Sequence, residues 1–112
     1  MPDSGDAEET DDMGLYVMKC LERGFDHYGP TTKQVVFWEL DKNYKLKENK
    51  ILLQPEKFVQ CLRQIFGPGS KTIEKVIIEE IKSSPRYSNV NDSDLILALK
   101  QIRAQHQRLQ VD

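Results

Sequence analysis

One stretch of the sequence decides the fold class: Leu62-Arg63-Gln64-Ile65-Phe66-Gly67-Pro68-Gly69-Ser70-Lys71-Thr72-Ile73-Glu74-Lys75-Val76-Ile77. Apolar residues recur every three or four positions on both sides of its centre, which is the spacing of a helix with one buried face. Glycine and proline at the centre end a helix sharply, because neither continues it well. The stretch therefore predicts two helices joined by a tight turn.

The same spacing extends in both directions from this stretch. It starts at Met13, returns after Thr31 and after Pro55, and appears once more after Asp92. We therefore predict an all-α domain of about five helices. The predicted segments are a disordered acidic leader at 1–12, a helical core domain at 13–84, a linker at 85–92 and a C-terminal amphipathic helix at 93–110.

The apolar stripes also predict the hydrophobic core. The residues after Thr31 are apolar around much of the helix, which is typical of a central helix, so Phe37 and Trp38 are interpreted as packing residues first and as a binding surface second. The predicted core residues are Leu21, Phe25, Val36, Phe37, Leu40, Phe58, Leu62, Ile65, Phe66, Ile73, Ile77 and Ile81.

Length and composition limit the classes of protein to consider. The 112 residues suffice for one compact domain. No run approaches the ~20 apolar residues of a membrane span, and the acidic start of the chain does not resemble a signal peptide. We therefore expect a cytoplasmic protein. Its two cysteines, Cys20 and Cys61, are expected to be reduced and buried.

The charges are unevenly distributed. Residues 1–12 carry six of the 18 acidic residues and no basic one, so the rest of the chain has 16 basic residues against 12 acidic ones. A basic body is compatible with an anionic partner, and the acidic leader could compete with that partner or serve only as a solvated tail.

No catalytic residue, metal site or cofactor is predicted. His27 and His106 are isolated from each other and from cysteines at metal-ligand spacing. The segment Gly69-Ser70-Lys71-Thr72 lacks both glycines of a phosphate-binding P-loop, because Ser70 precedes Lys71 and Ile65 stands five positions before Ser70, and it follows a helix rather than a strand. We therefore expect a binding protein rather than an enzyme.

The last predicted helix has the spacing of a coiled-coil seam. Apolar or weakly polar residues follow one another at intervals of four, three, four and three, which suits either a homodimer or packing onto the chain's own core. A dimer would also place the titratable His106 at the contact. The candidate partner residues are Leu95, Leu99, Ile102, His106 and Leu109.

The central turn resembles the helix-hairpin-helix family of sequence-independent DNA-binding motifs. That resemblance implies a phosphate held by the glycine backbone and by the start of the following helix, although Pro68 has no N–H to offer. A second group of lysines surrounds Tyr44 and could also contact phosphates. The candidate DNA-binding residues are Gly67, Gly69, Ser70, Lys71, Lys75, Lys42, Lys45 and Lys47.

A longer part of the chain resembles the archaeal Nitrosopumilus output domain family, which consists of small helical domains in signalling and regulatory proteins. The resemblance is carried by Tyr28-Gly29-Pro30, Val36-Phe37-Trp38, Pro55-Glu56-Lys57-Phe58 and Ile65-Phe66-Gly67-Pro68-Gly69-Ser70-Lys71. It implies a regulatory role in signal transduction or transcription, without a defined ligand. We therefore expect a non-enzymatic output module that acts through protein contacts, or alternatively a DNA-binding domain.

Overall fold

The computed structural model describes the backbone of residues 2–47 and 50–111 and the side chains of residues 13–47 and 50–105. This part of the chain contains no strand, so the all-α prediction is confirmed. Within these described ranges, five α-helices are accompanied by the 3₁₀ turns η2 and η3. The elements in chain order are α1 (Pro2–Asp26), α2 (Pro30–Asn43), α3 (Pro55–Phe66), η2 (Gly67–Gly69), α4 (Ser70–Lys82), η3 (Pro85–Tyr87) and α5 (Leu95–Val111).

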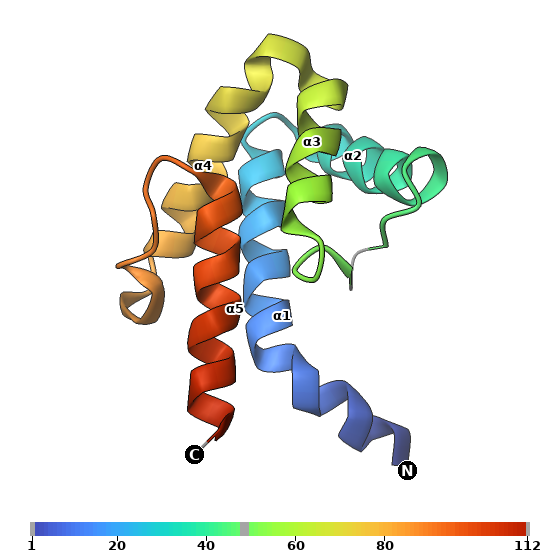
Figure 1. Cartoon of the computed structure of the whole chain (residues 1–112). Coiled ribbons are helices and arrows are strands. Elements are labelled where there is room, and N and C mark those ends of the chain that lie inside the picture. The colour runs from blue at the N-terminus through green and yellow to red at the C-terminus, as the bar shows by residue number, and fades with distance from the viewer. Residues whose placement is uncertain (1, 48–49, 112) are drawn as a thin grey trace.

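Helix α1 runs through the middle of the molecule, with α4 and α5 on one side and α2 and α3 on the other (Figure 1). Its closest neighbour is α4. Gly24 explains the close approach, because a Cβ atom at this position would lie 2.9 Å from Cγ1 of Ile77. A glycine thus lets the two helix backbones come together where a side chain would hold them apart.

Nine of the twelve predicted core residues are buried, and Phe37, Ile65 and Phe66 are partly buried against the core. Phe25 lies at the centre of an aromatic group, with its ring 5.6 Å from that of Phe37 and 6.4 Å from that of Phe66. The interpretation of Trp38 as a packing residue is wrong, because its side chain is 56% exposed. Helix α2 buries Val36 and Leu40 instead.

The segment expected as a linker, residues 85–92, is packed onto the domain. Tyr87 and Val90 are buried, and the ring of Tyr87 stacks on that of Tyr16 at 5.3 Å. The following helix begins at Leu95, and Asp94 caps its start, because Oδ1 of Asp94 accepts the Leu97 N–H. The C-terminal helix is therefore not separated from the core by a free linker.

The acidic leader at 1–12 falls on residues whose side chains lie outside the described part of the chain. The backbone of residues 2–12 is described as the first part of α1, so the structure does not show the disorder expected for this segment.

Candidate protein-interaction surface

Helix α2 presents two apolar side chains to solvent on the face opposite its buried residues. Val35 is 48% exposed and Trp38 is 56% exposed, although large apolar side chains are normally buried. They lie three positions apart and therefore adjoin each other on the helix surface. We name the surface formed by Thr31, Gln34, Val35, Trp38 and Lys42 the α2 outer face.

The local sequence holds α2 firmly in this orientation. Gly29 adopts φ 109°, a conformation that side chains rarely allow, and Pro30 starts the helix where a missing N–H costs nothing. The hydroxyl of Thr32 donates to the Tyr28 carbonyl at 2.9 Å. Phe37 packs edge-on against Phe25 of α1. The α2 outer face is therefore fixed by contacts on the other side of the helix.

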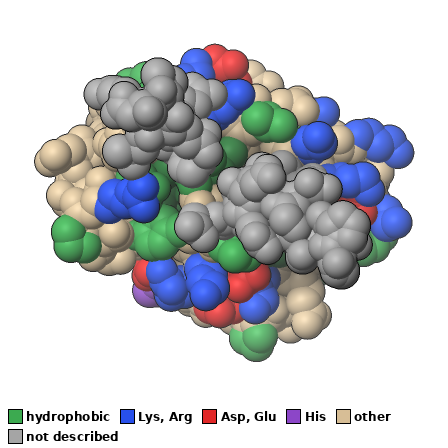
Figure 2. All heavy atoms as spheres, turned by 90° about the horizontal axis from the view of Figure 1, so that it is seen from below, with side chains coloured by type: hydrophobic (Ala, Val, Ile, Leu, Met, Phe, Trp, Pro, Cys, Tyr) green, Lys and Arg blue, Asp and Glu red, His purple; other side chains and the backbone are tan. Residues whose placement is uncertain are grey.

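Lysines lie at the C-terminal end of this face. Lys42, Lys45 and Lys47 are exposed, and Lys47 is 3.6 Å from a carboxylate oxygen of Asp41. Figure 2 shows basic side chains gathered at the edge of the molecule formed by this end of α2 and the chain after it. The exposed aromatic ring thus adjoins a basic surface.

The helix-hairpin-helix-like turn offers few free backbone donors. Gly67 has the positive φ of 60° that glycine permits, but Pro68 has no N–H and the Ser70 N–H donates to the Gly67 carbonyl. The Ser70 side chain is buried as well, at 3% exposure. Phosphate binding by the backbone of Ser70 would first require breaking this turn.

The remaining candidate DNA-binding residues form two separate groups. Lys71 and Lys75 are exposed one turn apart on α4, whereas Lys42, Lys45 and Lys47 lie at and beyond the C-terminal end of α2. These parts of the molecule lie on opposite sides of α1 and α3 (Figure 1). The structure therefore does not combine the eight residues into one surface.

The first three residues of the expected dimer seam are in the core. Leu95, Leu99 and Ile102 are fully buried by the chain's own helices, chiefly α3 and α4. A residue packed inside its own domain cannot also pack against a second copy. These three residues therefore belong to the core, and the expectation that they form a dimer contact is wrong. The side chains of His106 and Leu109 lie outside the described residues.

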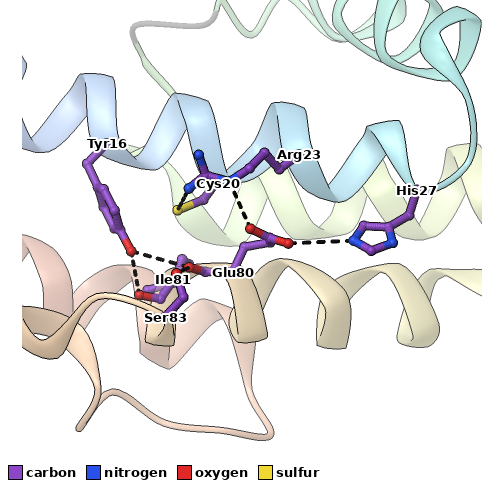
Figure 3. A network of polar contacts seen from close by, with 7 residues as sticks. All are labelled: Tyr16, Cys20, Arg23, His27, Glu80, Ile81 and Ser83. Atoms are coloured by element: carbon purple, nitrogen blue, oxygen red, sulfur yellow. Dashed lines mark hydrogen bonds and ion pairs between the residues drawn. The ribbon is translucent and has the colours of Figure 1, made fainter.

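Several chemically versatile side chains meet between α1 and α4, as Figure 3 shows. Arg23 Nε donates to Oε1 of Glu80 at 2.8 Å, and His27 Nε2 lies 3.5 Å from Oε2 of the same carboxylate. Cys20 is also present but fully buried, and burial raises the pKa of its thiol, which opposes formation of a nucleophilic thiolate. We interpret this cluster as a polar clamp that joins the two helices.

Tyr16 contributes to the same clamp, and its removal is expected to destabilise the domain. Its hydroxyl donates to the carbonyls of Ile81, at 2.7 Å, and Glu80, at 3.2 Å. Burial raises the pKa of this hydroxyl. Tyr16→Phe should lower the free energy of unfolding in urea by about 1 kcal/mol, since two carbonyls lose a donor. Tyr44→Phe, which removes an exposed hydrogen bond to Gln64, is the control. An equal loss of unfolding free energy in the two variants would contradict a stabilising role of Tyr16 in the clamp.

The described residues hold no group of three histidine, cysteine or acidic side chains placed to bind a metal ion. None of the helices within that same part of the chain combines the length and the apolar character needed to cross a bilayer.

Comparisons of this chain with models of protein families, with curated proteins and with solved structures find no match.

Proposed function

We propose that this chain is a non-enzymatic regulatory module that binds a protein partner through the α2 outer face. The observation that carries the proposal is the exposure of Trp38 beside Val35 on a rigidly held helix. Tryptophan supplies a large apolar area with few rotatable bonds, and it is enriched among the residues that dominate binding energy at protein interfaces. An amphipathic partner could therefore bury both side chains without any change in the fold.

The proposal differs from the sequence-based expectation in the surface used. Three of the expected partner residues of α5 are buried in the core, whereas Trp38, for which packing is the first expectation and a binding surface the second, is exposed. The role as an output module that the family resemblance implies stays part of the proposal. Nucleic-acid binding is the competing function, because exposed lysines accompany the tryptophan.

Site-specific photo-crosslinking in cells of the source organism tests this function. A benzophenone amino acid replaces Gln34, which is exposed on the α2 outer face, or Gln60, which is exposed on α3. We expect discrete protein adducts from position 34 and none of the same mass from position 60. Trp38→Glu in the position-34 protein should reduce these adducts at least tenfold, because a charge replaces the apolar anchor.

Circular dichroism provides the folding control for that variant, since the substitution lies at an exposed position. Adducts that persist at full yield with Glu at position 38 would contradict the proposed surface, and so would the absence of protein adducts from position 34.

A further inference from the structure

We propose that the partner bound by the α2 outer face is an acidic protein segment. It would place an apolar side chain against Val35 and Trp38 and carboxylates against Lys42 and Lys45. This inference rests on the proposed function and specifies the chemistry of the partner. It is carried by the order of apolar and charged groups along α2.

The α2 outer face changes character along the helix axis. Its N-terminal half carries the uncharged Thr31, Gln34 and Val35. Trp38 follows in the middle, and Lys42 lies one turn, about 6 Å, further along the same face. A complementary segment therefore needs its apolar group at one end and its negative charges at the other.

The two lysines are available to such a partner within the part of the chain that the structure describes. The nearby carboxylates have other contacts there: Asp41 is paired with Lys47 at 3.6 Å, and Glu39 accepts a hydrogen bond from Asn43 at 2.6 Å. Neither Lys42 nor Lys45 forms an ion pair with any described side chain. Carboxylates of a partner would therefore add contacts without breaking existing ones.

The backbone after α2 keeps Lys45 beside the helix end. Lys45 has a φ of 56°, which turns the chain sharply. Leu46 is buried, and its N–H donates to the Leu40 carbonyl at 2.8 Å. The turn is thus anchored in the core on one side of Lys45, and the lysine is held near Lys42 rather than carried away on a free loop.

A nucleic acid fits this surface less well than an acidic protein does. Phosphates recur at regular intervals along a nucleic acid, so a bound strand would continue over the N-terminal half of the face, which offers no cation. A protein segment can confine its negative charges to one end.

The test uses the full chain and the fluorescence of Trp38, which is the only tryptophan in the sequence. The probes are a short amphipathic peptide with leucines at one end and glutamates at the other, the same peptide with every glutamate replaced by glutamine, and a thymidine oligonucleotide. Burial of the ring should move its emission to shorter wavelength. We expect the glutamate peptide to cause this shift. It should also bind about tenfold more tightly than the glutamine peptide at low salt, because two exposed ion pairs each contribute modestly to the affinity.

Two pairs of lysine substitutions locate the charge effect. Lys42→Glu with Lys45→Glu should abolish the preference for the glutamate peptide, whereas Lys71→Glu with Lys75→Glu on α4 should leave it unchanged. Lys42→Gln with Lys45→Gln is the milder variant to use if charge reversal disturbs folding, and the same loss of preference is expected. Added salt should also reduce the preference, because screening weakens exposed ion pairs.

Three results would overturn the inference. Equal affinity for both peptides, with the fluorescence shift retained, would leave the proposed docking surface in place but exclude an acidic partner. Tighter binding of the oligonucleotide, lost with the Lys42 and Lys45 substitutions, would show that the surface serves a nucleic acid. If neither peptide shifts the emission, the inference fails, and the crosslinking experiment separately decides the proposed function.

Discussion

Leu99→Glu is expected to leave the chain without a stable fold. Leu99 is fully buried where α5 packs against α3 and α4, so the substitution would either bury an unpaired charge or expel the helix. The cost of several kcal/mol approaches the whole stability of a small domain, about 5–15 kcal/mol. Circular dichroism at increasing temperature should show no cooperative unfolding transition.

Leu97→Glu is the matched control, since Leu97 lies two positions earlier on the same helix and is 43% exposed. The midpoint temperature of unfolding of this variant should lie within a few degrees of that of the wild-type chain. If Leu99 lay in a seam between two copies, Leu99→Glu would instead give a folded monomer. That outcome would show that α5 is not docked as described.

Phe25→Ala is expected to lower the free energy of unfolding by about 3–5 kcal/mol, the usual cost of removing a buried phenyl ring and leaving a cavity. Phe25 has no exposed surface and contacts aromatic rings from both α2 and α3. Its loss should therefore loosen the attachment of α2 to the rest of the domain. Urea denaturation followed by the loss of helical circular dichroism measures the effect.

Tyr28→Ala is the control for that measurement. The Tyr28 ring lies 6.3 Å from that of Phe66, but its side chain is 43% exposed. We expect its removal to cost about 1 kcal/mol, the range of a partly exposed aromatic pair. Similar losses for Tyr28→Ala and Phe25→Ala would contradict the central place of Phe25 in the core.

The sequence predicts the helices well because each has a local signal. Gly67-Pro68-Gly69 ends one helix, Pro55 begins another, and the apolar stripes of α3 and α4 have a single clear direction. The starts of α1 and α2 are less well predicted, because α1 begins at Pro2 rather than Met13 and α2 at Pro30 rather than after Thr31. A clear stripe indicates which side of a helix is buried, whatever the helix packs against. Most of the predicted core is therefore confirmed.

Helix α2 is different because it has two apolar stripes. Val36 and Leu40 lie on one side and Val35 and Trp38 on the other, so hydrophobicity alone cannot tell which side faces the core. The neighbours of α2 decide, since Phe25, against which Phe37 packs, comes from α1. The presence of two opposed stripes was itself the available signal that one of them would remain exposed.

The seam-like spacing in α5 shows a second limit of prediction from the sequence. The spacing of Leu95, Leu99 and Ile102 is the same whether a helix packs on its own domain or on a second copy, because the period describes the helix and not its neighbour. Tyr87 and Val90, which lie in a segment rich in turn residues, gave no periodic signal at all. Their burial depends on contacts with distant residues such as Tyr16.

The pairing of α1 with α4 also has a consequence for synthesis on the ribosome. Helix α1 is made first, but α4, which covers it most extensively, is made only after α2 and α3. Chains grow at about 5–20 residues per second, so the apolar stripe of α1 waits for seconds before Gly24 can meet Ile77. During that interval the apolar residues of α1 that later pack against α4 lack their partner helix, and the pair can form only after residues 70–82 have left the exit tunnel.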